Sequence, residues 1–361
     1  MKGEKMNSIE LIKKLSDARG VSGFEDEVAE LGKKFIGEDY PVDEDKIRNL
    51  YINNIPKEKR TKPVVMLDAH SDEVGFMVQS IEPNGLLKFI TLGGWSNQQI
   101  PAHKVKVLNR EGEYVEGIIS SIPPHFTSKA EAGKVTDIKD MFIDVGTTSY
   151  DETVNDFKIG IGAPVVPDVE CTYNEKSRMF LGKAFDDRIG CAVIVDVMKQ
   201  LKDTNLDITL TGVFSSQEEE GCRGAVIAAQ KVMPDLAIVL EGPPADDNFR
   251  GEFRSQGALR KGAQVRHIDP TMIANPRLVK FIQKIAYENN IKIQETVRES
   301  GGTNGSRIHL ENGGIPTIVI GIPVRYTHSH YGFISYDDYL ETVKLVKAVA
   351  ENITKEIIES F

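Results

Sequence analysis

Two kinds of hydrophobic periodicity divide this chain into regions. Residues 8–19 and 25–35 repeat apolar side chains at helical spacing, and Gly20 follows the first segment as a stop signal. Residues 64–67, which come directly after Pro63, are a continuous apolar run, and such a run is typical of a strand buried on both faces. The chain therefore begins as an α/β pattern, with two helices before its first buried strand.

Between residues 74 and 167 the pattern changes to short alternating segments, with no convincing helix among them. Pro-Asn-Gly, Gly-Gly and Pro-Pro breaks separate these segments, which cover residues 76–81, 86–91, 105–108, 114–119 and 141–145. We expect a small all-β, barrel-like domain over residues 73–163. It would be inserted into a catalytic domain that is made of residues 1–72 and 164–361.

From Gly182 onward, helices and strands alternate. Strands are expected at residues 208–214, 236–240 and 316–322, and helices near Asp186 and at residues 222–232, 276–289 and 336–358. Alternation of this kind implies crossover connections and a mainly parallel sheet. The predicted fold class is α/β, with a mixed, mainly parallel sheet that is flanked by helices and interrupted by the small all-β domain.

The composition is that of an ordinary folded protein, and it narrows the classes of partner. Of the 361 residues, 40% are hydrophobic and 27% are charged, so the chain can bury a sizeable core. The net charge of -10 argues against non-specific binding to nucleic acid or to an anionic membrane, and no long apolar run suggests a membrane span. Because the three cysteines show no paired spacing, we expect no disulfide framework and a cytoplasmic protein.

Histidines and carboxylates follow each of the strands expected in the parallel sheet. Ligands bind beyond the carboxyl ends of such strands, so the side chains found there are candidates for a site. In chain order, the residues that follow the strands are His70 and Asp72, then Glu218, Glu219 and Glu220, then Glu241, and finally His328 and His330. Together with Asp186, they predict a cluster of carboxylates and histidines at one edge of the sheet.

A cluster of carboxylates is stable only with a cation, because each carboxylate raises the pKa of the others. Histidine and carboxylate donors without thiolate suit Zn, Co or Mn better than Ca or an iron–sulfur cluster. The candidates outnumber the ligands of one zinc ion, so we expect two metals that share a carboxylate and hold a hydrolytic water. Each motif also has a plain structural explanation: Asp186 and Asp187 could cap a helix, and residues 218–220 could be a solvated acidic run.

Five motifs, in this order, resemble the M42 family of metallo-aminopeptidases, which includes glutamyl and tetrahedral aminopeptidases. They are residues 70–75, 184–191, 218–221, 301–303 and 325–329, and the likeness extends over nearly the whole chain. The resemblance implies a sheet of the zinc-peptidase type and hydrolysis of the N-terminal peptide bond of peptides with a free N-terminus. It also implies two divalent ions per subunit, which we expect to be Zn or Co, and homo-oligomers from dimers to dodecamers that assemble through the inserted domain.

The resemblance also assigns roles to individual residues. The implied metal ligands are Asp186 as the bridge, His70 and Glu241 at one metal, and Glu219 and His328 at the other. Asp72 would orient His70, and Glu218 would be the general base that takes a proton from the water and returns it to the leaving amine. Asp187 is then left to cap the helix or to pair with Arg188 or another cation.

Two positions depart from the pattern that is common in the family. Glu241 stands where many relatives have Asp, and Asn304 stands where the sequence Gly-Gly-Thr is usually followed by Asp, so a charge is lost near the pocket. These departures bear on metal affinity and substrate preference more than on the reaction class.

Two other functions stay open from the sequence. Paired carboxylates also hydrolyse glycosides, but a glycosidase mostly needs no metal and would leave the histidines without a role. A non-catalytic assembly or peptide-binding protein could keep metals for stability, but it would have no use for a base such as Glu218 beside a ligand.

Overall fold

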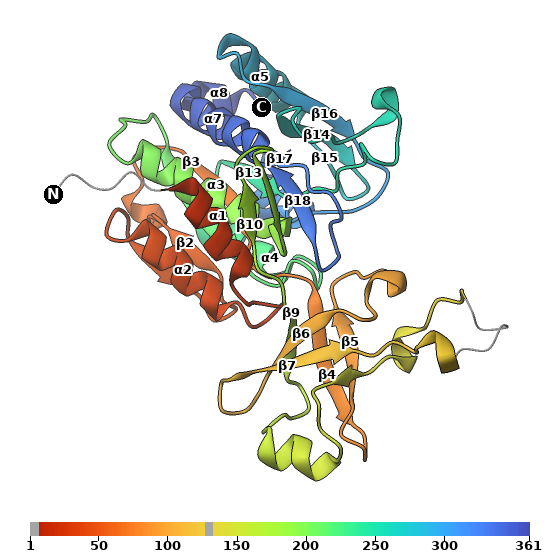
Figure 1. Cartoon of the computed structure of the whole chain (residues 1–361). Helices are drawn as coiled ribbons and strands as arrows, with labels where there is room; N and C mark the ends of the chain where they lie inside the picture. The colour runs from red at the N-terminus through yellow and green to blue at the C-terminus, as the bar shows by residue number, and fades with distance from the viewer. Residues whose placement is uncertain (1–6, 127–132) are drawn as a thin grey trace.

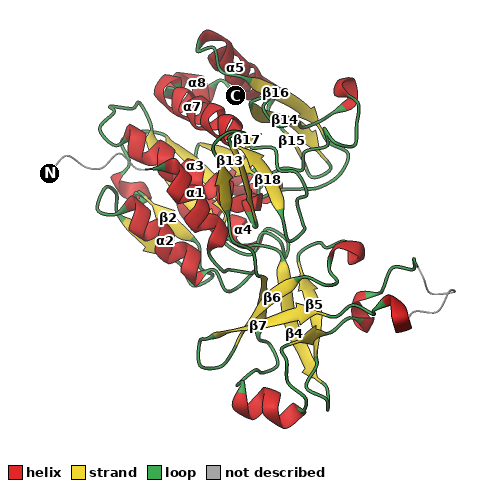
Figure 2. Ribbon diagram, viewed as in Figure 1, coloured by secondary structure: helices red, strands yellow, loops and turns green. Residues whose placement is uncertain are grey.

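The computed structural model describes residues 7–126 and 133–361. Figure 1 shows two parts, an α/β part that is built from both ends of the chain and a β-barrel that is built from its middle. In Figure 2, helices cover the sheet of the first part, whereas the barrel is mostly strands and loops. The predicted fold class is therefore confirmed.

The main sheet has nine strands in the order β1-β2-β12-β3-β13-β17-β14-β15, with β16 paired to β14. Their bounds are β1 (Val42–Glu44), β2 (Leu50–Ile52), β3 (Val64–His70), β12 (Thr209–Ser215), β13 (Leu236–Glu241), β14 (Ala263–Asp269), β15 (Met272–Ile273), β16 (Ile293–Val297) and β17 (Thr317–Gly321). Strands β12, β3, β13 and β17 run parallel to their neighbours in this series, and antiparallel strands β2 and β14 flank them. The four parallel strands thus end at one edge of the sheet.

Helices cover both faces of this sheet. One face packs against α1 (Ser8–Asp17), α2 (Asp26–Ile36), α3 (Phe185–Leu201), α5 (Pro276–Glu288), α7 (Tyr336–Asn352) and α8 (Lys355–Glu359). The other face packs against α4 (Arg223–Val232) and the short α6 (Gly305–Ile308). A separate three-stranded sheet consists of β10 (Thr172–Asn174), β11 (Met179–Gly182) and β18 (Gly332–Ser335). It lies against α1 and α7, on the first of these two faces.

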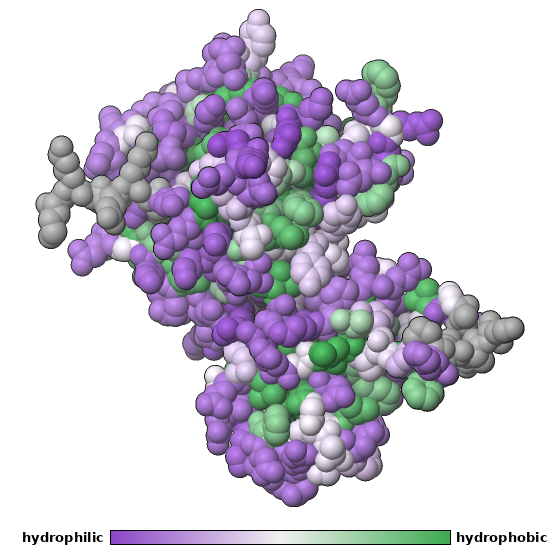
Figure 3. Space-filling view, viewed as in Figure 1, coloured by the Kyte–Doolittle hydropathy of each residue, from purple (hydrophilic) through white to green (hydrophobic). Residues whose placement is uncertain are grey.

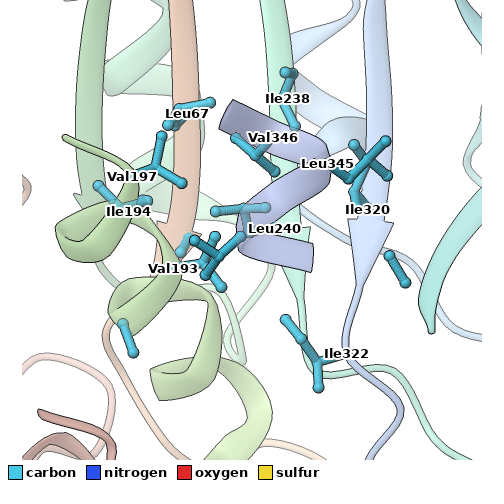
Figure 4. Close-up of a cluster of buried hydrophobic side chains, with 14 of the residues drawn as sticks. Leu67, Val193, Ile194, Val197, Ile238, Leu240, Ile320, Ile322, Leu345 and Val346 are labelled. Atoms are coloured by element: carbon cyan, nitrogen blue, oxygen red, sulfur yellow. The ribbon is translucent and has the colours of Figure 1, made fainter. Parts of the chain in front are cut away.

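The apolar run in β3 is buried on both sides, as its sequence predicts. Val65 and Leu67 join the larger core with α3 and α7, whereas Val64 and Met66 join the core under α4. Figure 4 shows side chains of β3, β13 and β17 packing against those of α3 and α7. The strands contribute Leu67, Leu240 and Ile320, and the helices contribute Val193 and Leu345. The strands that carry the candidate site residues are therefore fixed by dense apolar packing.

The middle of the chain forms a closed barrel with strand order β4-β5-β8-β7-β6-β9. Its strands are β4 (Gly75–Ile81), β5 (Leu87–Leu92), β6 (Lys104–Leu108), β7 (Tyr114–Ile119), β8 (Ile143–Asp144) and β9 (Pro164–Pro167). A short π-helix, Glu152–Asp156, and 3-10 turns interrupt the strands. Because β9 pairs with β4 and β6, the barrel reaches past residue 163. The division of the chain into two domains at residues 72 and 163 stays a prediction.

The sequence predicts one continuous C-terminal helix over residues 336–358, and this prediction is wrong because the structure has two helices there. Helix α7 ends at Asn352, because Ile353 is extended, and the side chain of Thr354 then caps a second helix by accepting from the Ile357 amide. Both helices keep apolar side chains in the core, so the amphipathic pattern continues across the break. Periodicity alone could not show where the helix changes direction.

A buried ion-pair network joins the two parts of the molecule. Glu73 lies just before β4, and both of its carboxylate oxygens accept hydrogen bonds from Lys183, at 2.6 and 2.7 Å. Arg188 approaches the same carboxylate at 3.4 Å and donates to the carbonyls of Ser71 and Gly20. All three charged side chains are at most 2% exposed. They hold the end of α1, the start of α3 and the entry to the barrel together.

We expect Lys183→Met to destabilise the protein by about 3 kcal/mol, because it leaves one charge of a buried pair without its main partner. The control is Lys344→Met, which removes a lysine that is 62% exposed from a surface pair with Glu341 and should cause no measurable change. Chemical unfolding followed by circular dichroism measures both variants. Equal stability of the two would contradict a structural role for the network.

Candidate metal centre

The candidate site lies at the edge where the parallel strands end. Strand β3 ends at His70 and β13 ends at Glu241, so both side chains are placed by the sheet itself. Glu218 and Glu219 follow β12, and His328 lies in the loop between β17 and β18. The sequence predicts this gathering from the parallel order, and the structure brings together His70, Asp72, Asp186, Glu218, Glu219, Glu241 and His328. His330 and Glu220, which the sequence also placed in the cluster, have other contacts.

Asp186 faces both histidines at once. Its Oδ1 lies 3.0 Å from His70 Nε2, and its Oδ2 lies 3.5 Å from His328 Nε2. The residue stands at the start of α3 with extended backbone angles, φ -86 and ψ 103, and its peptide bond to Asp187 is cis. A carboxylate whose two oxygens meet two different histidines has the geometry of a bridging ligand.

Two further carboxylates complete the two halves of the centre. Glu241 Oε1 lies 3.9 Å from His70 Nε2, and Glu219 Oε1 lies 3.6 Å from His328 Nε2. Ligand atoms of Asp186, Glu219 and His328 all lie within 4.8 Å of one another. Each histidine therefore has its own carboxylate and shares Asp186 with the other.

Asp187 has a different environment from its neighbour. Its Oδ1 accepts from the Gly190 amide in the first turn of α3, and its Oδ2 accepts from the His70 amide. This contact is the helix cap that the sequence suggests for Asp187. The alternative pairing with Arg188 is not formed, because the Arg188 guanidinium binds carbonyls and Glu73 instead. One Oδ of Asp187 also comes within 4.8 Å of ligand atoms of His70 and Glu241.

Asp72 is a buried residue that fixes the positions of several groups of the site. Its carboxylate accepts from Ser22 Oγ at 2.6 Å and from the amides of Glu218 and Glu219 at 2.9 and 3.1 Å. His70 Nδ1 lies 3.1 Å from the Asp72 carbonyl and 3.4 Å from its carboxylate, so this nitrogen faces only acceptors. A proton on Nδ1 leaves Nε2 free to act as a donor atom toward a metal.

Glu218 lies beside the candidate ligands and has a contact that the sequence did not indicate. Its Oε2 is 4.0 Å from His70 Nε2, and its Oε1 accepts from the thiol of Cys222 at 3.3 Å. Burial and the charges of Asp186 and Asp72 raise the pKa of Glu218, although His70 opposes the shift. Nothing in the spacing of a single cysteine distinguishes such a contact from ordinary core packing.

The electrostatics of the centre call for cations. Burial and the nearby Asp186 charge raise the pKa of Glu219 and of Glu241 well above the ordinary value. Deep burial opposes the charge of Asp186 as well, but its hydrogen bonds to His328 and His70 lower its pKa. The set of carboxylates can ionise together only when positive charge balances it, and its nitrogen and oxygen donors suit divalent ions such as Zn or Co. The residues present therefore fit a pair of divalent metals.

His330 and Asn304, which the sequence analysis highlights, lie outside the cluster. His330 is buried against His103 and Trp95, with ring centroids 4.0 and 5.1 Å away, and does not join His328. Asn304 is buried beneath the site, where its amide donates to Asp68 and to Ser215 Oγ, both at 2.7 Å. Asn304 thus supports β3 and β12 rather than lining the cavity. The only sign of Asp68 in the sequence is that a charged residue directly follows the apolar run of residues 64–67 and lies within the same strand.

A cavity of about 800 Å³ opens directly onto the centre. Asp186, Glu218, Glu219 and His328 line one side, and the predicted turn at Gly301 and Gly302 lines another. A volume of this size is in the range of about 300 to 1,000 Å³ that is typical of sites for small molecules.

A comparison with known proteins decides the family. The model of the M42 glutamyl aminopeptidase family matches residues 49–345. The chain belongs to this family. Among its relatives, the glutamyl aminopeptidase of Lactococcus lactis subsp. cremoris is 30% identical over 353 residues, which are 97% of this chain and 98% of the relative. The M42 assignment confirms the predicted enzyme class, an aminopeptidase.

Solved structures agree with this M42 assignment. The TET aminopeptidase from Thaumarchaeota archaeon SCGC AB-539-E09 superposes with a TM-score of 0.92 at 37% identity, covering 98% of this chain and 99% of that chain. The TET1 peptidase of Pyrococcus horikoshii, which can assemble into a tetrahedron or a large octahedral shell, gives 0.86 at 26% identity, with 96% and 100% covered. Within the part of this chain that the structure describes, no helix is long and apolar enough to cross a membrane.

Glu25 supports the loop that carries Glu218. Its side chain is fully buried, and its Oε1 accepts from the amides of Gly23 and Gln217 at 2.7 and 3.2 Å. Burial, followed by the charge of Asp72, raises the pKa of Glu25 from 4.5 to about 7. The folded protein therefore holds this proton more tightly than the unfolded chain does.

From this shift we expect a pH-dependent effect of Glu25→Gln. The stability that neutral Glu25 contributes is fully present below about pH 4.5 and is lost as the pH rises through about 7, a change of about 3 kcal/mol. The variant lacks this titration. Its melting temperature should therefore rise relative to that of the wild type between about pH 5 and about pH 8, at constant metal content. Parallel pH profiles for the two proteins would contradict the shift.

Proposed function

We propose that this protein is a dinuclear metal-dependent aminopeptidase that hydrolyses the N-terminal peptide bond of peptides. The observation that carries the proposal is the position of Asp186, whose two carboxylate oxygens face His70 on one side and His328 on the other. In this proposal the ligands are Asp186, His70 and Glu241 for one metal, and Asp186, Glu219 and His328 for the other. Zn and Co are the expected ions because the donors are nitrogen and oxygen.

The protein's own residues divide the chemical work among them. When bound, two divalent ions supply Lewis-acid polarisation of the scissile carbonyl and lower the pKa of water. Glu218 takes a proton at Oε2 from the attacking water and returns it to the nitrogen of the leaving amine. Cys222 holds Oε1 of the same carboxylate, which leaves Oε2 directed toward His70 and the ligands.

Asp72 links the positions of the base and the ligands. One carboxylate fixes the amides of both Glu218 and Glu219 and also faces His70 Nδ1. The base, one ligand of each metal and the Nδ1 proton are therefore held by a single side chain that is itself fully buried. We assign Asp72 a positioning role on this ground.

The two alternative functions fit the geometry less well. A glycosidase would use two carboxylates on either side of a sugar and would need no histidine, but Asp186 and Glu219 each face a histidine as well as the cavity. A metal-stabilised binding or assembly protein has no need for the carboxylate of Glu218 beside the ligands. The centre opens into a cavity of about 800 Å³, and this arrangement fits an enzyme that receives the free N-terminus of a peptide.

We also propose that the protein forms homo-oligomers through its barrel, from a dimer up to a dodecamer. Apolar side chains on the barrel are exposed, among them Ile90 (44%), Ile118 (52%) and Ile122 (69%). Figure 3 shows hydrophobic surface over this lower part of the molecule, whereas much of the rest of the visible face is hydrophilic. Assembly of the similar TET1 peptidase into closed shells supports the proposal.

The proposed reaction is tested with a panel of aminoacyl-p-nitroanilides, with and without a chelator. We expect hydrolysis of unblocked substrates, loss of that activity after chelation and its return with Zn or Co. N-acetylated substrates are the control and should be stable, because the free amine is part of the recognised group. Activity that survives complete metal removal would falsify the metal mechanism, and cleavage of an oligosaccharide instead would support the glycosidase.

A second prediction separates the base from the ligands. Glu218→Gln should bind about two metals per chain while its turnover falls by about a hundredfold or more, because general-base catalysis contributes roughly that factor. Asp186→Ala, in contrast, should lose metal from both positions. Metal analysis after dialysis and initial rates on one substrate measure the two effects. A fully active Glu218→Gln enzyme would show that another group is the base.

A further inference from the structure

The loop between β5 and β6 of the barrel, residues 93–103, reaches the candidate metal centre. In Figure 1 it lies on the side of the barrel that faces the α/β part. Gly94 lines the cavity, and its carbonyl oxygen lies 2.7 Å from His328 Nδ1. A carbonyl oxygen can only accept, so His328 carries its proton on Nδ1 and leaves Nε2 free toward Asp186 and Glu219. The barrel therefore orients the ring of a candidate ligand that belongs to the other part of the molecule.

A neighbouring glycine of the β5–β6 loop meets the second ligand of the same half. Gly93 has a φ of +74, and a Cβ placed on it would lie 2.8 Å from Glu219 Oε2. Its amide donates to Glu220 Oε1 at 3.0 Å. Glu220 thus ties the barrel to the chain directly beside Glu219, and the absence of a side chain at Gly93 leaves room for the Glu219 carboxylate.

Stacked rings hold the loop that carries His328. His330, two positions after the ligand, is 1% exposed, and its ring stacks on that of His103 with centroids 4.0 Å apart and planes 16° apart. The centroid of Trp95 lies 5.1 Å from that of His330, and Trp95 stacks in turn on Phe76 of β4 at 4.7 Å. The barrel contributes every ring of this cluster except that of His330. His330 is therefore the point at which the barrel grips the loop of His328.

The loop of His328 has a backbone that needs such support. Tyr326 and His328 have φ angles of 64 and 59, in the left-handed region that residues other than glycine rarely adopt. A conformation of this kind persists only where its surroundings hold it. His70, in contrast, is the last residue of β3 and pairs with β12 in the sheet. The two halves of the centre therefore differ in what fixes their ligands.

We propose that the barrel is a positioning element of the metal centre and that its β5–β6 loop fixes Glu219 and His328 for one of the two metals. The inference rests on the dinuclear centre of the proposed function. The ligands of the other metal, His70 and Glu241, end strands of the sheet and are placed without the barrel. Loss of the loop contacts should therefore weaken one metal position and spare the other.

Gly94→Ala tests the contact with the ring of His328. Gly94 has no positive φ, so alanine fits its backbone, but the added Cβ would lie 3.2 Å from His328 Nδ1. Each full-length protein is loaded with Zn and equilibrated with a series of chelator concentrations, and the bound metal is measured. We expect the weaker-held metal of the variant to bind about tenfold to a hundredfold less tightly than in the wild type, as loss of support for a ligand does. The control is Gly251→Ala, whose Cβ would meet nothing within 4 Å, and it should bind both metals normally.

Single-site backgrounds identify the metal position that is affected. In a His70→Ala protein the position of Glu219 and His328 remains, and Gly94→Ala should weaken its metal by the same factor. In a His328→Ala protein the position of His70 and Glu241 remains, and Gly94→Ala should change nothing there. An equal loss in both backgrounds would contradict a selective role of the barrel.

Variants of His330 test the stacked rings in the same measurement. His330→Leu removes the ring and should weaken the same metal, whereas His330→Phe keeps a ring against His103 and should restore most of the affinity. Val107→Ala truncates a buried side chain in the core of the barrel and controls for a general loss of barrel stability. It should lower the melting temperature and leave metal binding unchanged. If His330→Leu does not fold, Gly94→Ala and His330→Phe still decide the question.

The outcomes separate this inference from the proposed function. Two metals in the wild type and equally tight binding in Gly94→Ala and His330→Leu would overturn the positioning role alone. A loss in Val107→Ala as large as that in His330→Leu would show that only the stability of the barrel matters, and it too would overturn the role. A wild-type protein that does not bind two metals would overturn the dinuclear centre, and the inference with it.

Discussion

Repulsion among buried carboxylates is the constraint on which the site of this molecule depends. Asp186, Glu219 and Glu241 are brought to one edge of the sheet by a parallel strand order that apolar packing enforces. Packing supplies the stabilisation that holds the charges close, and only positive charge can relieve their repulsion.

The sequence is informative where chemistry follows directly from strand order. The apolar run of β3 predicts that His70 emerges at a strand end, and the candidate ligands Glu219, Glu241 and His328 follow from the same argument applied to β12, β13 and β17. Asp187 is a finer case, because adjacent aspartates have identical chemistry in the sequence. The backbone separates them: one carboxylate turns to the histidines and the other caps α3.

Contacts between distant segments account for what the sequence could not predict. Asn304 donates to Asp68, which lies 236 residues away in the sequence. The contact between Cys222 and Glu218 spans only four residues, but it depends on the conformation of the loop after β12. Short strands such as β1 and β15, of three and two residues, leave no periodicity to detect. Hydrophobic pattern thus predicts layers, whereas side-chain pairing requires the assembled sheet.

The buried pair of Glu73 and Lys183 has a mechanical consequence, because the barrel begins close to the candidate metal centre. Only three positions separate His70 from Glu73, and β4 of the barrel begins two positions later. A displacement of the barrel therefore acts on a dehydrated ion pair, braced by Arg188, before it can act on His70. The ion pair thus fixes the entry to the barrel, so that the barrel is joined to the sheet next to the candidate metal centre without displacing His70.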